Sequence, residues 1–114
     1  MGDQRRIRHH LLPVPTVDIS ATIGDLASLG PIEHMAAVVG PDQVLLGAVS
    51  PAALQLPGET AVRQIMISAP GTMRPDLRID EAAERLRKDH LDHSFVTTTS
   101  GVLLGMVITK ELHA

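Results

Sequence analysis

The chain has 114 residues, enough for one compact domain that buries about two-thirds of the surface of its unfolded state. Its 10 Lys and Arg residues and 13 Asp and Glu residues give a net charge of −3, which provides no electrostatic attraction to nucleic acid or to an anionic membrane. The absence of cysteine excludes disulfides, thiolate nucleophiles and cysteine-bound metals. No apolar run approaches the roughly 18 residues of a membrane span, so we expect a cytoplasmic protein.

The first elements follow a basic N-terminal stretch, RRIRHH, which we interpret as part of a tail covering residues 1–15. Thr22 and Asp25 have the spacing of a capping box and predict the start of a helix. The β-rich runs MAAVV and VLLGAV are separated by the turn sequence GPDQ, and this pattern predicts a hairpin over residues 35–49. Ser50 before Pro51 is typical of the N-cap of a further short helix.

The later elements repeat this order. A short helix is predicted over residues 59–66 and ends before Ala69-Pro70-Gly71. One apolar face then recurs at helical spacing over residues 79–86, formed by Ile79, Ala82, Ala83 and Leu86. The runs SFVTT and VLLGMVI flank a turn that contains Gly101 and predict a second hairpin.

An internal repeat explains this order. The tetrapeptide VLLG occurs at residues 44–47 and again at 102–105, 58 residues later. Upstream of it, Thr16 and Ile23 align with Thr72 and Ile79 at a spacing of 56. The two aligned stretches therefore differ in spacing by two residues, which a single two-residue gap in the first copy accounts for. We therefore expect a tandem repeat of about 56–58 residues per copy, and repeat architectures are best recognised from such self-similarity.

Each copy resembles the CBS domain, the family named after cystathionine β-synthase. The resemblance covers residues 16–112 and is carried by Met66, the Thr72–Pro75 entry, the Ala-Ala helix and the ending from Gly105 to Leu112. It implies an α+β fold in which two units, each an amphipathic helix with a short β-sheet, pack about a pseudo-twofold axis as a Bateman module. The expected organisation is an N-terminal tail over 1–15, a first CBS-type unit with linker helix over 16–66, and a second over 67–114.

The resemblance also implies a function. Bateman modules bind adenosine-containing ligands such as AMP, ADP, ATP or S-adenosylmethionine between their units, form dimers, and regulate other proteins. The family places a Thr or Ser on the last strand and an Asp three residues later, where the carboxylate accepts hydrogen bonds from the ribose. Here Ser50 keeps the hydroxyl in the first copy, whereas the second copy keeps the acid as Glu111. The ligand-binding residues implied in this way are Ile19, Ser20, Ala21, Ser50, His93, Ser94, Ile108, Thr109 and Glu111.

The motif is split, because Ala53 replaces the acid in the first copy and Ile108 replaces the hydroxyl in the second. The main expectation is a homodimeric, non-catalytic regulator with one weak adenosine site and no required cofactor. The alternative is a dimerisation or protein-interaction module whose nucleotide sites have degenerated. A third interpretation is a histidine-based metal sensor, since His90 and His93 stand beside Asp89 and Asp92, although a role at the end of a helix is favoured.

Overall fold

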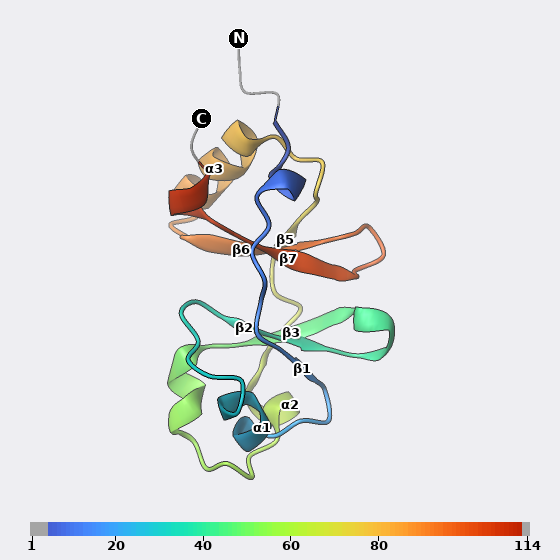
Figure 1. The fold of residues 1–114 in the computed structure, drawn as a ribbon, viewed down its shortest axis with the longest axis vertical. Coiled ribbons are helices and arrows are strands. Elements are labelled where there is room, and N and C mark those ends of the chain that lie inside the picture. The colour runs from blue at the N-terminus through green and yellow to red at the C-terminus, as the bar shows by residue number, and fades with distance from the viewer. Residues whose placement is uncertain (1–4, 113–114) are drawn as a thin grey trace. The chain divides into compact units, whose positions relative to one another are not determined.

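The computed structural model describes residues 5–112, which form two compact α+β units. The first unit comprises residues 14–70, and the second comprises residues 71–112 together with the N-terminal segment 5–13 (Figure 1). The α+β fold class expected from the sequence is confirmed, because each unit contains helices and one small sheet. Among the described residues, every helix is too short or too polar to span a bilayer.

The first unit is built on a four-stranded sheet in the order β1-β2-β3-β4. Strand β1 is parallel to β2, and the other neighbours are antiparallel. Its strands are β1 (Thr16–Asp18), β2 (Ala36–Val39), β3 (Leu45–Val49) and β4 (Ile67–Ser68), and its helices are α1 (Ile23–Ala27) and α2 (Val62–Ile65). Two 3₁₀ segments, Pro41–Gln43 and Pro51–Gln55, follow β2 and β3. Both α-helices lie on the same side of this sheet (Figure 1).

The second unit repeats this topology in a three-stranded sheet of order β5-β6-β7. Strands β5 and β6 are parallel, and β6 and β7 form the predicted hairpin. The elements are β5 (Thr72–Met73), α3 (Ile79–Lys88), β6 (His93–Thr97) and β7 (Leu103–Ile108), with 3₁₀ segments at Ile7–His9 and Thr109–Glu111. Matching strand orders and directions are what two copies of one repeat should produce.

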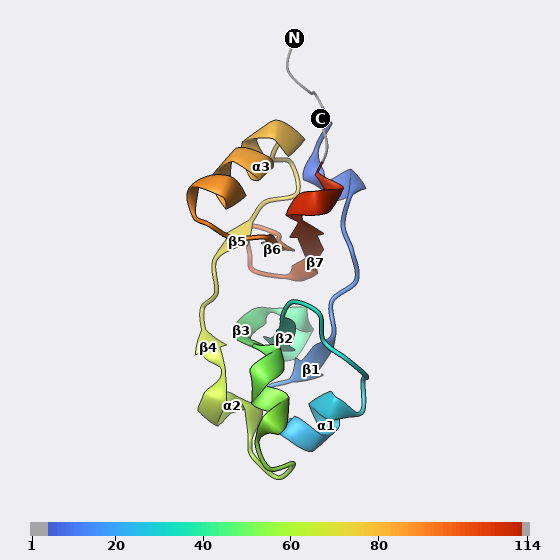
Figure 2. The same ribbon diagram turned by 90° about the vertical axis from the view of Figure 1, so that its left-hand side faces the viewer.

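The N-terminal segment 5–13 belongs to the core and the sheet of the second unit. Ile7 is 0 % exposed and lies in that unit's hydrophobic core. Leu12 pairs with the edge strand β7, because its N–H donates to the carbonyl of Met106 at 2.8 Å and the Met106 N–H donates back at 3.0 Å. Figure 2 shows the segment running beside β7. This placement differs from the N-terminal tail expected from the sequence. The contact is favourable because it buries an apolar side chain and supplies hydrogen bonds to an open strand edge.

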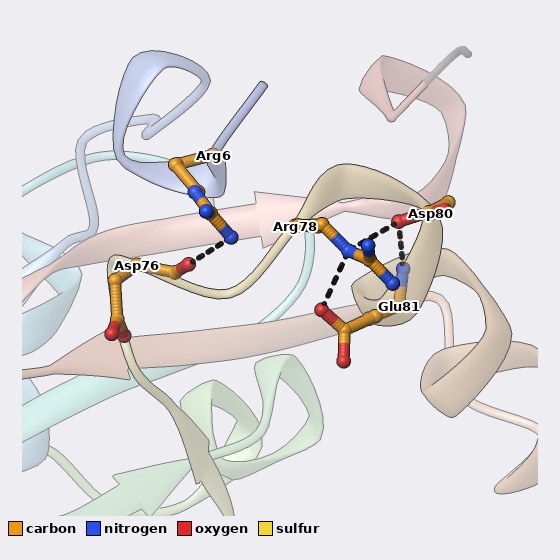
Figure 3. Close-up of polar contacts among 5 residues, drawn as sticks. All are labelled: Arg6, Asp76, Arg78, Asp80 and Glu81. Carbon is orange, nitrogen blue, oxygen red and sulfur yellow. Dashed lines mark hydrogen bonds and ion pairs between the residues drawn. The ribbon is translucent and has the colours of Figure 1, made fainter. Parts of the chain in front are cut away.

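Side-chain and backbone bonds hold the same segment against the loop before α3. The N–H of Ile7 donates to the carbonyl of Leu77 at 2.9 Å. The Arg6 guanidinium donates through Nη1 to the backbone carbonyl of Asp76 at 3.1 Å (Figure 3). The segment is therefore anchored at Arg6 and Ile7, in addition to its pairing at Leu12.

The segment also has a repeat counterpart in the first unit, which the sequence comparison missed. Ile7 corresponds to Val62, which is likewise 0 % exposed, and Leu12 corresponds to Ile67, which pairs with Ala48 of β3. The N-terminal segment therefore matches α2 and β4. Each unit is completed by the segment that precedes the other repeat copy in the sequence.

The two cores are aliphatic, as the composition requires. The first contains Val17, Ile23, Leu26, Ile32, Ala36, Val38, Val49 and Val62. The second contains Ile7, Met73, Ile79, Ala82, Leu86, Val96, Val107 and Leu112. The predicted apolar face of α3 is confirmed, since Ile79, Ala82 and Leu86 are buried and Ala83 packs partly against them.

The two main helices begin and end differently. The predicted capping box of α1 is confirmed, with Thr22 and Asp25 each accepting a backbone N–H of the other. Helix α3 has no side-chain cap at Arg78; instead the Arg78 guanidinium contacts Glu81 at 2.9 Å and Asp80 at 3.5 Å (Figure 3). Carboxylates in this first turn favour the helix dipole.

Helix α3 ends in a Schellman motif. The N–H of Leu91 donates to the carbonyl of Leu86 at 2.9 Å, and the N–H of His90 donates to that of Arg87 at 3.2 Å. His90 occupies the left-handed position with φ of 58°, where glycine is usual. The helix-end role expected for His90 is thus performed by its backbone.

Candidate ligand site of the second unit

The candidate site is formed where β7 ends and β6 begins. Because the two strands are antiparallel, His93 lies opposite Ile108, and Ser94 lies opposite Val107. The N–H of Thr109 donates to the carbonyl of Asp92 at 2.8 Å, which extends this pairing by one residue. The structure therefore brings His93, Ser94, Ile108 and Thr109 to one edge of the second sheet.

The acid of the candidate site stands on a short turn that follows β7. Thr109, Lys110 and Glu111 are all exposed and form a 3₁₀ segment. The residues on either side, Ile108 and Leu112, are each 5 % exposed, and Leu112 N–H donates to the carbonyl of Thr109 at 3.0 Å. Two buried anchors thus fix the backbone of the turn, while the Glu111 carboxylate faces solvent.

Polar contacts orient the two side chains at the start of β6. His93 Nδ1 lies 2.6 Å from Asp92 Oδ1, and the imidazole is half-buried. The Ser94 hydroxyl donates to the carbonyl of Phe95 at 3.1 Å, so its oxygen stays available as an acceptor. A carboxylate on the imidazole Nδ1 fixes the tautomer and the orientation of the ring.

The equivalent turn of the first unit, Pro51–Gln55, contains no acid. Ser50 is the N-cap of the 3₁₀ segment that begins at Pro51, as predicted, but its hydroxyl makes no capping bond. Ala53, at the position of the acid, packs against the first core. This turn offers the Ser50 hydroxyl without a carboxylate, so a ribose hydroxyl pair would lack the acceptor that Glu111 supplies in the second unit.

The other predicted residues of the first unit lie at the opposite end of its sheet from Ser50. Ile19 follows β1 and donates its N–H to the carbonyl of Val39, at the end of β2, at 2.9 Å. Because β2 and β3 are antiparallel, Ser50 adjoins the beginning of β2 instead. Ile19, Ser20 and Ala21 therefore do not share an edge with Ser50.

A carboxylate next to these residues was missed in the sequence. Asp18 Oδ2 accepts hydrogen bonds from the Ser20 hydroxyl at 2.6 Å and from the Ser20 N–H at 2.9 Å. These two bonds lower the pKa of Asp18 from its ordinary value, because both stabilise the ionised form. The spacing Asp-x-Ser is typical of such a turn and could have indicated it.

Two units with the same order of helices and strands define the protein as a tandem α+β module. Residues 62–113 match the family model described as the CBS domain. This segment, just under half of the chain, is therefore similar to a CBS domain, and the fold of the two units is that of a CBS-domain pair. This confirms the resemblance drawn from the sequence.

Solved structures of the same fold have low sequence identity to this chain. The CBS domains of a transcriptional regulator from Streptococcus pneumoniae have a TM-score of 0.81 at 16 % identity, covering 96 % of this chain and 98 % of that one. CBSX2 in complex with AMP has a TM-score of 0.79 at 18 % identity, covering 94 % and 92 %. The cytosolic domain of the Mg²⁺ channel MgtE in complex with ATP has 0.76 at 21 %, covering 90 % and 45 %. A comparison with curated protein sequences gave no match.

Proposed function

We propose that this CBS-domain pair is a non-catalytic regulatory module that binds one adenosine-containing ligand, with Glu111 accepting hydrogen bonds from the ribose hydroxyls. The observation that supports it is an exposed carboxylate on a turn whose two ends are buried, which follows the strand that pairs with His93 and Ser94. A carboxylate has two oxygens and can accept both hydroxyls of one ribose. Related folds bound to AMP and to ATP support the ligand class.

The remaining ligand contacts in this proposal come from Thr109 and from the family resemblance. Thr109, exposed and adjacent to Ile108, supplies the hydroxyl that the strand itself lacks. Ile19, Ser20 and Ala21 enter the proposal through the family resemblance, as the residues that line the adenine. The sequence has no Trp or Tyr, so the base has to be held by aliphatic contact. Because Ile108 replaces the hydroxyl of the motif, the site lacks one of its expected hydrogen bonds. Loss of one charge-assisted hydrogen bond costs roughly 1.5–3 kcal/mol and weakens binding by about one to two powers of ten, so we expect the ligand to bind weakly.

The regulator is proposed to act as a cytoplasmic homodimer, as the resemblance implies, and to signal ligand binding to another protein. One site per chain is expected, because Ala53 leaves the first unit without the acceptor that Glu111 supplies in the second. Ser50 then has its local role at the start of the 3₁₀ segment. AMP, ADP, ATP and S-adenosylmethionine all share the ribose that Glu111 would bind.

The test is a titration of the full chain with AMP, ADP, ATP and S-adenosylmethionine, followed by calorimetry and by the shift in melting temperature. A ligand that binds only the folded state at a hundredfold excess over its Kd adds about 2.7 kcal/mol of stability. The Glu111→Gln variant should lose at least about tenfold in affinity. Glu59→Gln, which removes an equally exposed charge from the first unit, should bind as the wild type does. Equal binding by Glu111→Gln and wild type would reject the mechanism.

A second candidate is a dimerisation module with no ligand, and the replacement of the acid by Ala53 and of the hydroxyl by Ile108 favours it. Both side chains pack inward, Ala53 in part and Ile108 at 5 % exposure. Sedimentation at several concentrations measures the dimer directly. A stable dimer combined with no response to any of the four adenosine ligands would favour this candidate over the sensor.

A further inference from the structure

The second unit holds an exposed arginine in a fixed position at the end of β5. Arg74 follows Met73, and its Nη1 donates to the Thr97 hydroxyl oxygen at 2.6 Å and to the Thr72 hydroxyl oxygen at 3.0 Å. Thr97 is 2 % exposed and is the one buried polar residue of the part of the chain that the structure describes. A long cationic side chain is thus tied down by a buried hydroxyl.

The donors that remain on Arg74 are the ones that bind oxyanions. A guanidinium has five N–H donors, and the edge formed by Nε and Nη2 matches two oxygens of a carboxylate or phosphate. Within residues 5–112 this edge of Arg74 makes no hydrogen bond or ion pair. In Arg87 the same edge holds both oxygens of Glu84, and in Arg78 it contacts Glu81. Arg74 differs from these arginines in having no carboxylate partner among the described residues.

The two threonines add further donors. Each hydroxyl oxygen accepts a bond from Arg74, so its hydroxyl hydrogen is left to donate to another group. Burial of the Thr97 hydroxyl makes a bond to an acceptor favourable, because a buried donor without a partner is destabilising. The cluster therefore combines one positive charge with several N–H and O–H donors, which is the chemistry that recognises an oxyanion.

This cluster is separate from the candidate site at Glu111. The parallel register pairs Thr72 with Phe95 and Met73 with Val96, so Arg74 lies beside Thr97 at the far end of β6. His93 begins the same strand four residues earlier, about 13 Å away at the usual rise of a strand. The first unit has no counterpart, since Asp18 and Val39 occupy the corresponding paired positions.

We propose that Arg74, with Thr72 and Thr97, forms a binding site for a phosphate group, supplied either as inorganic phosphate or by a phosphorylated small molecule. The Nε–Nη2 edge binds two phosphate oxygens, and the threonine hydroxyls hold the guanidinium in position. The site does not depend on Glu111 or on the adenosine ligand.

The experiment follows the Nε–H resonance of Arg74 by NMR in the full chain during titration with inorganic phosphate. Sodium chloride at matched ionic strength is the control, because chloride cannot accept two parallel bonds. The Nε–H signal should move with phosphate in a saturable way and stay in place with chloride. AMP and adenosine distinguish the sources: AMP should reproduce the shift if a nucleotide can supply the phosphate, and adenosine should not.

Two variants and a matched control make the test specific. Arg74→Lys keeps the charge but loses the two-pronged edge, and phosphate affinity should fall about tenfold, equivalent to about 1.4 kcal/mol. Thr97→Val keeps the shape but removes the hydroxyl, and it should also weaken phosphate binding. Arg63→Lys changes an exposed arginine of the first unit and should have no effect.

The outcomes separate this proposal from the adenosine site. The Glu111→Gln variant should bind phosphate unchanged, whether or not it binds AMP. Equal phosphate affinity in Arg74→Lys and Arg63→Lys would overturn the site. An Arg74 Nε–H chemical shift that changes with neither phosphate nor AMP would also overturn the site.

Discussion

The two units share a topology but differ in the chemistry of their exposed positions. Asp18, the last residue of β1, and Arg74, the residue after β5, occupy equivalent positions of the repeat and carry opposite charges. Ala53 and Glu111 likewise follow equivalent hairpins, one packed on the core and the other in solvent. Buried positions of the repeat therefore preserve the fold, whereas exposed positions are where a duplicated unit acquires a different site.

The units also differ in how they are completed. In the first unit, α2 and β4 belong to the same continuous stretch of chain as the rest of the unit. In the second unit, the segment equivalent to α2 and β4 is residues 5–13, which are far away in the sequence. Ile7 and Val62 take the same place in their cores and are both fully buried. The second unit consequently depends on a distant segment for part of its core and for one strand edge.

The largest expected effect is the loss of that distant contact. Ile7→Ala should destabilise the protein by about 2–5 kcal/mol, because it removes buried carbons and leaves a cavity. Val62→Ala should cost less by about 0.8 kcal/mol, since one CH₂ fewer is lost. Urea unfolding measures both changes. Arg8→Ala, an exposed neighbour, should change the free energy of unfolding by less than about 0.5 kcal/mol; a similarly small effect of Ile7→Ala would refute this packing.

A smaller difference is expected between the two VLLG glycines. A Cβ at Gly105 would lie 2.9 Å from the carbonyl oxygen of Leu12 and 3.2 Å from Leu11 Cβ. A Cβ at Gly47 would meet the flexible Met66 side chain first, which can move, and would lie 3.1 Å from the backbone carbonyl oxygen of Ile67. Gly105→Ala should therefore cost about 1–3 kcal/mol and Gly47→Ala less, as thermal unfolding would show. The reverse order would mean that the N-terminal segment yields more readily than Met66.

Helix ends provide the next comparison. After α1 the left-handed position is taken by Gly30, with φ of 102°, whereas after α3 it is taken by His90. His90→Gly should stabilise the protein by about 1 kcal/mol, because glycine adopts this conformation without steric cost. Asp89→Gly, at the C-cap with φ of −91°, is the control and should not stabilise. Melting temperatures of the two variants decide between these outcomes.

The smallest effect concerns Asp18. Its hydrogen bonds from Ser20 keep its pKa below the usual value of about 3.9, so its contribution to stability is present above that pH and is lost as the pH falls through the lowered pKa. Ser20→Ala should raise the pKa of Asp18, measured by NMR titration of its side chain. Ser28→Ala removes a hydroxyl that donates to the Gly24 carbonyl and should leave the Asp18 pKa unchanged. An unchanged pKa in Ser20→Ala would contradict the hydrogen bonds.

Features encoded by neighbouring residues were predictable from the sequence. The capping box at Thr22, the apolar face of α3 and both hairpins depend on contacts within a few residues, where spacing and propensity dominate. The helix predicted over 59–66 proved shorter, at Val62–Ile65, because Gly58 and Glu59 form a turn before it, closed by a hydrogen bond from the Thr60 N–H to the Pro57 carbonyl. The second strand of each hairpin, VLLG, was recognisable because the repeat preserves it.

Contacts between distant residues were decided by the tertiary structure. The sequence contains the apolar Ile7 and Leu12, but their partners Leu77 and Met106 are more than 60 residues away. An open strand edge can pair with a segment from anywhere in the chain, so the sequence near Leu12 does not reveal the pairing. The Arg74–Thr97 bond spans 23 residues and needs the parallel register of β5 and β6. Local hydrogen bonds and periodicity act within a few residues of the chain, whereas sheet pairing and core packing join positions whose separation leaves no regular pattern in the sequence.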